Sequence, residues 1–224
     1  MGQLRAKSIW AVSVLAGFNL LWYVLLSIAG ISSDSMIIWG LSDSRFELWQ
    51  LLSYMMVHAD FAHFISNTFV LILVGIMVCR YIGGGLTILV YLVSGITGGV
   101  AFMLSIRAES SALAGSSAAV LGLAGCLLAI LFRFKRRHPF WYAELGVVIA
   151  VALISFCFNG FNAGGILAHS AGLTMGLTFG LLCRTIKHKR KTDEIIDRAL
   201  QSGFCSLSDT EKEELAMRSI NRIR

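Results

Sequence analysis

Six long apolar segments are the feature that most constrains what this chain can fold into. An apolar segment of about 20 residues is long enough to cross a bilayer as a helix. The segments are residues 9–31, 68–79 with a polar lead-in at 58–67, 86–106, 112–132, 141–158 and 166–183. The first exceeds the roughly 7–15 apolar residues of a signal peptide, and no convincing small-x-small cleavage site closes it. The sequence therefore predicts an all-α polytopic membrane protein, a bundle of six transmembrane helices.

Composition agrees with a membrane protein. Only 14% of the 224 residues are charged, against about 25% in soluble domains, and 56% are hydrophobic. A single proline and 22 glycines suit closely packed membrane helices. The five cysteines are scattered, without CxxC or Cys/His zinc spacing. We interpret them as small buried side chains and expect no disulfide, metal or cofactor.

The net charge of +6 is concentrated in a few clusters. If the six segments alternate in direction, Arg45 and Arg107 are the only basic residues on one side of the membrane. The other side carries Arg5, Lys7, Arg80, Arg133, Lys135, Arg136, Arg137, Arg184, Lys187, Lys189, Arg190 and Lys191. Basic loops are cytoplasmic, so we expect both termini in the cytoplasm. The clusters thus indicate membrane orientation rather than nucleic-acid binding.

Two stretches are too polar to span a membrane. Residues 32–59 mix charged with aromatic side chains, which predicts an interfacial or partly embedded loop with short helical pieces. Residues 185–224 predict a short soluble tail after a membrane domain at 1–184. The basic stretch 187–191 of the tail suits contact with anionic lipids. Residues 193–200 and 210–220 predict two amphipathic helices, the second with a capping box from Ser208 to Glu211.

Ser117 lies among small residues in the fourth segment, in the sequence AGSSAAVLG (114–122). Gly115 suits a tight turn into a helix that begins at or near Ser117, which would place the positive end of the helix beside the hydroxyl. Such a serine can serve close helix packing alone. It becomes a nucleophile only with an adjacent base, and His169 in the first turn of the sixth segment is the candidate.

His63 and Asn67 are four residues apart at the start of the second segment and share a helical face. Polar side chains at membrane depth mark functional sites, although Asn67 could instead form a packing hydrogen bond. In the alternating topology the second, fourth and sixth segments all start on the outer side. His63, Asn67, Ser117 and His169 would therefore meet at one depth.

The order H-x4-H-x3-N, G-x-S and A-H-x2-G resembles the rhomboid family of intramembrane serine proteases over roughly residues 49–180. The resemblance implies that Ser117 is the nucleophile and His169 the base of a Ser–His dyad. It implies that His63 and Asn67 stabilise the oxyanion and that His58 braces the loop. Gly172 begins the G-x3-G-x3-G pattern where the sixth helix would contact the fourth. The implied partners are transmembrane protein substrates and lipids, in the bacterial inner membrane.

Three residues depart from the family pattern and affect the expected activity level. Ala118 follows the serine where glycine is usual, Leu121 replaces an aromatic residue of some members, and Gln50 replaces arginine after Trp49. Ser116 is the competing hydroxyl, but the G-x-S spacing favours Ser117. An inactive rhomboid-like protein that binds and escorts membrane proteins is one alternative, and a transporter or channel that uses the intramembrane histidine and asparagine side chains is another. The presence of both Ser117 and His169 argues against the first, and the single depth of the polar residues argues against the second.

Overall fold

A computed structural model describes most of the chain. The described residues are 2–30, 38–42, 46–105, 112–134, 141–158, 163–183, 195–196, 198–199 and 202–223. The chain divides into two compact units, Met1–Cys183 and Arg184–Arg224, and each is treated by itself. The predicted basic stretch 187–191 lies outside the described residues.

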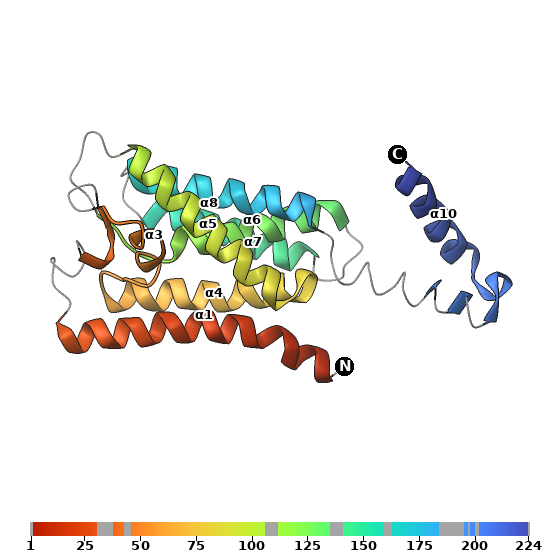
Figure 1. The fold of residues 1–224 in the computed structure, drawn as a ribbon, viewed down its shortest axis with the longest axis horizontal. Helices are drawn as coiled ribbons and strands as arrows, with labels where there is room; N and C mark the ends of the chain where they lie inside the picture. Colours follow the sequence, from red (N-terminus) through yellow and green to blue (C-terminus); the bar gives the residue numbers. More distant parts are fainter. Residues whose placement is uncertain are drawn as a thin grey trace. The chain divides into compact units, whose positions relative to one another are not determined.

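The first unit is a bundle of helices (Figure 1). Its long helices are α1 (Gly2–Ala29), α4 (Phe61–Ile82), α5 (Gly84–Ser105), α6 (Ser117–Phe134), α7 (Trp141–Phe158) and α8 (Ala163–Leu182). Four of these, α1, α4, α5 and α8, are long and apolar enough to cross a membrane. α6 and α7 are apolar too, but shorter over their described residues. The structure thus confirms an all-α polytopic membrane fold, while the count of six spans stays a prediction.

One helix start differs from the prediction, and another agrees with it. The sixth apolar segment becomes helical at Ala163, so His169 lies in the second turn of α8 rather than the first. The fourth becomes helical at Ser117, as predicted, although its apolar segment begins five residues earlier with the strand Ala112–Leu113 and the turn after it. Gly115, with φ of +110°, lies in that turn, where a side chain would strain the backbone. Apolar composition marks where a segment can be buried, but it does not mark where the helix begins.

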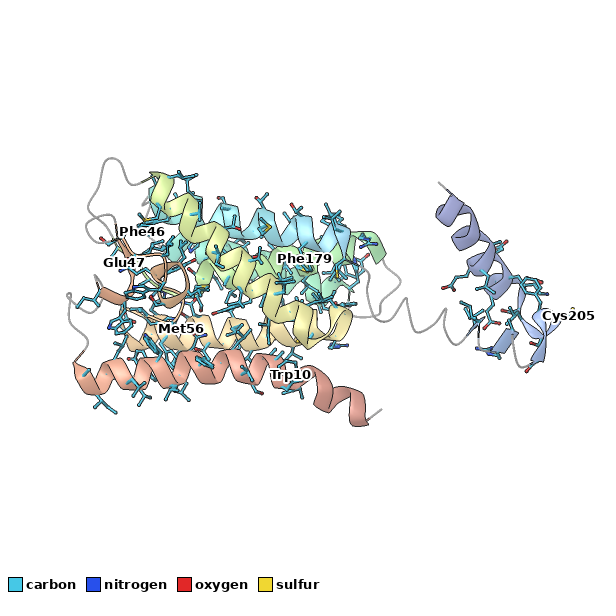
Figure 2. All side chains as sticks on the ribbon, viewed as in Figure 1. Trp10, Phe46, Glu47, Met56, Phe179 and Cys205 are labelled. Atoms are coloured by element: carbon cyan, nitrogen blue, oxygen red, sulfur yellow. The ribbon has the colours of Figure 1, made fainter. Side chains whose placement is uncertain are left out.

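One end of the bundle, which we call the loop end, carries α3 (Gln50–Ser53) and a two-residue antiparallel bridge. The bridge pairs β1 (Leu41–Ser42) with β2 (Ala112–Leu113). Figure 1 shows α3 at the end of the bundle opposite the N-terminus, and Glu47 and Met56 lie at this end in Figure 2. The bridge was not predicted, since a strand of two residues has no periodic pattern. It ties the loop after α1 to the segment that leads into α6.

α6 is the central helix, and almost every residue from Ala118 to Leu131 is buried. α8 packs on it through glycines. A Cβ added at Gly172, Gly176 or Gly180 would collide with the carbonyl oxygen of Ala118, Gly122 or Cys126 respectively. The two backbones therefore touch directly, as small residues allow in membrane helices. This close contact fixes the depth of α8 against α6.

Polar contacts tie the helices together at the opposite end of the bundle. The Tyr81 hydroxyl donates to Glu144 Oε2 at 2.7 Å, and Arg80 Nη1 lies 3.8 Å from Glu144 Oε1. These contacts join α4 to the first turn of α7 around a carboxylate that is only 2% exposed. Arg133 on α6 donates to the carbonyl oxygens of Gly180 and Cys183, at the C-terminal end of α8, where the helix itself offers these oxygens no N–H donor.

The second unit is small and helical. Residues 195–196 and 198–199, within the predicted helix 193–200, are helical where described. After η1 (Phe204–Ser206), α10 spans Asp209–Ile223. The predicted capping box is present, since the Ser208 amide donates to Glu211 at 3.0 Å and the Glu211 amide to the Ser208 hydroxyl at 3.4 Å. Arg198 also pairs with Glu211 at 3.0 Å.

Candidate active site

Ser117 and His169 meet at the centre of the candidate site. Ser117 Oγ lies 2.7 Å from His169 Nε2, although 52 residues separate them in sequence. His169 is 2% exposed, because α8 holds it against α6 through the glycine contact described above. A hydroxyl bonded to a neutral imidazole nitrogen at this distance can pass its proton to that ring. The pair has the geometry of an activated nucleophile and its base.

The start of α6 adds hydrogen-bond donors beside the Ser117 hydroxyl. The helix begins at Ser117, and the Val120 amide is the first to donate inside it, to Ser116 at 2.9 Å. The amides of Ser117 and the next two residues therefore have no acceptor within the helix. Their N–H groups and the helix dipole favour negative charge at this point.

His63 and Asn67 face the turn before Ser117. A Cβ added at Gly115 would lie 2.8 Å from His63 Nε2 and 3.7 Å from Asn67 Nδ2. Both side chains can donate hydrogen bonds, and Asn67 already gives one to the His63 carbonyl at 3.0 Å. Gly115 is therefore required twice, for its positive φ and for the space that the His63 ring fills.

His58 supports His63 from the loop. Its ring is 1% exposed and meets the His63 ring edge to face, with centroids 5.2 Å apart. Burial, and to a lesser extent the neighbouring His63, lowers the pKa of His58 to about 4. The His58 ring is therefore neutral at physiological pH, and its Nδ1 lies 3.2 Å from the Met56 carbonyl oxygen.

A cavity of about 490 Å³ opens beside Ser117. It is bounded by α4, α6 and α7, and its lining consists of Asp60, Ala62, His63, Ser66, Asn67, Val70, Ser117, Val120, Ile154 and Ser155. Asp60, Ala62, Ser66 and Ile154 are exposed, so the cavity reaches the surface. A mixed polar and apolar wall of this size can hold water together with a short stretch of peptide.

Three contributions to the site were not predicted from the sequence. Ile154 and Ser155 bring α7 to the cavity, but α7 is apolar on all sides and its pattern does not reveal which face is used. Tyr54 holds the turn, because its carbonyl accepts from the Gly115 amide at 2.8 Å and its hydroxyl donates to Gly95 at 2.6 Å. Asp60 caps α4 by accepting a hydrogen bond from the His63 amide. An aspartate three residues before the amide that it caps is the sequence signal for such a cap.

Two of the departures from the family pattern have a physical explanation. The Ala118 methyl group fits because the residue opposite is Gly98, where an added Cβ would lie 2.7 Å from it. Gln50 is fully buried and bridges the loop, accepting from the Glu47 amide at 2.8 Å and donating to the Ile38 carbonyl at 2.8 Å. Leu121 is fully buried in α6.

A helical membrane bundle that holds a serine–histidine pair beside a cavity with a mixed polar and apolar wall defines the class of this protein. The Rhomboid domain family matches residues 45–186, which is more than half of the chain, and the chain belongs to the rhomboid family. Rhomboid protease GluP of Bacillus subtilis (strain 168) is 30% identical over 198 residues, or 83% of this chain and 38% of that protein.

Two relatives from Arabidopsis thaliana carry rhomboid-like names. RHOMBOID-like protein 6, mitochondrial, is 30% identical over 143 residues, which is 61% of this chain and 44% of that protein. RHOMBOID-like protein 4 is 36% identical over 136 residues, which is 61% of this chain and 34% of that protein. The chain therefore spans less than half the length of each of these three relatives.

Proposed function

We propose that this protein is an intramembrane serine endopeptidase that cleaves transmembrane segments of other membrane proteins. The observation that carries the proposal is the 2.7 Å contact between Ser117 Oγ and His169 Nε2 inside an apolar bundle. The cavity beside it supports the proposal, because hydrolysis needs water as well as room for a peptide. The similarity to a protein named as a rhomboid protease supports it further.

His169 takes the Ser117 proton as the hydroxyl attacks a peptide carbonyl, and then donates it to the leaving amine. Water from the cavity then attacks the acyl-enzyme, and His169 takes a proton from the water and returns it to Ser117 Oγ as the acid product leaves. The developing oxyanion needs donors aimed at it, and the Ser117 amide, the His63 ring and the Asn67 amide are the candidates. The substrate helix must unwind locally, because a helical backbone keeps its carbonyl oxygens in internal hydrogen bonds.

A serine-directed fluorophosphonate tests whether Ser117 is activated. We expect covalent modification of the purified protein, mapped by peptide mass spectrometry to Ser117. His169→Ala should lose the modification, because the hydroxyl then has no base. Modification of Ser116 in place of Ser117, or equal labelling of the His169→Ala protein, would contradict the assignment.

The donor residues should have a different signature from the dyad. We expect His63→Ala and Asn67→Ala to lower kcat by roughly 10²–10³, with KM changed less, because one oxyanion donor is lost while the Ser117 amide remains. Steady-state kinetics in liposomes and a melting curve for each variant measure this. A variant with native kcat and a lowered melting temperature would show that the residue only packs.

We propose further that the protein lies in the bacterial cytoplasmic membrane with both termini in the cytoplasm. The distribution of basic residues along the sequence supports this orientation. The loop end, with the candidate site, then faces outward. The basic residues at 187–191 would lie at the inner surface, where anionic lipids attract them.

Cysteine labelling in intact cells tests the orientation. In a cysteine-free background, Glu109→Cys should react with a membrane-impermeant maleimide from outside, whereas Arg136→Cys should react only after lysis. Cys205, which is exposed in the soluble unit, is the matched marker for the cytoplasmic side when it alone is restored. Labelling of position 136 but not 109 in intact cells would reverse the topology.

A further inference from the structure

Asp60 is the only charged residue among the described residues that line the cavity. It is exposed at the loop end of α4. We propose that the Asp60 carboxylate selects substrates that carry a lysine or arginine shortly before or after the scissile bond, on the loop-end side of that bond. This inference rests on the proposed function and specifies its substrate class.

The position of Asp60 is fixed by its second role. One carboxylate oxygen, Oδ1, accepts from the His63 amide at 2.7 Å and caps α4. A carboxylate accepts bonds at both oxygens, so Oδ2 can receive a charged donor while Oδ1 holds the helix start. The cap thus keeps a negative charge at a set distance from His63 without using all of its hydrogen-bonding capacity.

The register with the substrate follows from helix and strand geometry. Asp60 precedes His63 by three residues, a rise of about 4.5 Å along α4 toward the loop end. A substrate unwound at the site advances about 3.3 Å per residue. A substrate residue one to three positions from the scissile bond therefore lies level with Asp60. A long lysine or arginine side chain at that residue can extend toward the Asp60 carboxylate.

The other lining residues do not oppose this preference. Ser66, Asn67 and Ser155 are neutral, and the apolar lining residues Ala62, Val70, Val120 and Ile154 suit the hydrophobic part of a transmembrane segment. A basic residue at the edge of a substrate helix would meet one unlike charge, whereas an acidic residue would meet a like charge. Attraction in one case and repulsion in the other should together give about a 5- to 30-fold preference for a substrate with a basic residue over one with an acidic residue.

Three synthetic transmembrane peptides test the inference. They are identical except for lysine, glutamine or glutamate at one position, and a further set of three is made for each of the three positions on the loop-end side of the cut. Dissociation constants are measured with the Ser117→Ala protein, which binds without cutting, and kcat/KM with the native protein. We expect the order lysine, glutamine, glutamate in both measurements, with the preference reduced at 0.5 M salt.

Asp60→Asn is the matched variant, because asparagine caps a helix as well as aspartate does but carries no charge. It should keep the melting temperature and bring the three peptides within about two-fold of one another, and Asp60→Lys should invert their order. Glu47→Gln removes an exposed charge at the loop end, outside the cavity lining, and should change nothing.

The outcomes separate this inference from the proposed function. Cleavage by the native protein with equal dissociation constants and equal kcat/KM for the three peptides would overturn charge selection alone. A persistent lysine preference in the Asp60→Asn protein would also overturn it. Absence of cleavage together with the expected binding order would overturn the peptidase assignment and leave charge selection standing. Failure of all three peptides to bind would overturn charge selection.

Discussion

Replacement of Ser117 or of His169 by alanine should lower kcat by roughly 10⁴–10⁶, to the background of the assay, while the protein stays folded. The two side chains share one hydrogen bond of 2.7 Å. The nucleophile cannot act without its base, and the base has no proton to take without the nucleophile. The double variant should therefore be no worse than either single one, because residues that act as a unit are not additive. Steady-state turnover in liposomes, with a melting curve for each variant, measures this.

Ser116→Ala is the matched control for Ser117→Ala. Ser116 is the neighbouring hydroxyl, and it is 1% exposed, outside the cavity lining. Its loss should leave turnover within a few-fold of native. The assignment would be wrong if Ser117→Ala retained near-native turnover or if Ser116→Ala were the variant that lost it.

The second large effect should come from the contact between α6 and α8. We expect Gly176→Ala to destabilise the protein by about 3 kcal/mol or more, because overpacking a tight contact costs about 1–3 kcal/mol even where side chains can shift. Here the new methyl group would meet the Gly122 carbonyl oxygen, which is backbone and cannot turn away. Separation of the helices would also move His169 away from Ser117, so activity should fall with stability.

Gly165→Ala is the control in the same helix. A Cβ added at Gly165 meets nothing within 4 Å. Alanine there should raise stability by about 0.4–1 kcal/mol, because it restricts the unfolded chain and favours the helix. Thermal unfolding in detergent compares the two variants. Equal melting temperatures for Gly176→Ala and Gly165→Ala would mean that the α6–α8 contact is not tight.

The fold class could be predicted because long apolar segments leave a chain few ways to satisfy its backbone other than membrane helices. The meeting of Ser117 and His169 could be predicted from topology, since alternating segments bring the starts of the fourth and sixth to one depth. Their contact at 2.7 Å then depends on α8 lying directly on α6. The glycines at 172, 176 and 180 indicated that close approach in the sequence itself.

The rest of the site depends on tertiary contacts that leave no local pattern. The β1–β2 bridge and the bond from the Gly115 amide to Tyr54 join segments about 60–70 residues apart. Neither residue type nor spacing marks such a pairing in advance. The same holds for the face of α7 that reaches the cavity, because an apolar helix without a polar stripe has no preferred face until its neighbours are placed.

Cleavage of a transmembrane peptide by the purified protein tests the central claim most directly. Native protein and Ser117→Ala are incubated in liposomes with a peptide whose apolar segment of about 20 residues contains small, helix-weakening residues near one end. Products are identified by mass spectrometry. We predict a single cut near that end with the native protein and an intact peptide with Ser117→Ala. An intact peptide with both proteins, or the same cut with both, would contradict the claim that Ser117 and His169 form an intramembrane peptidase.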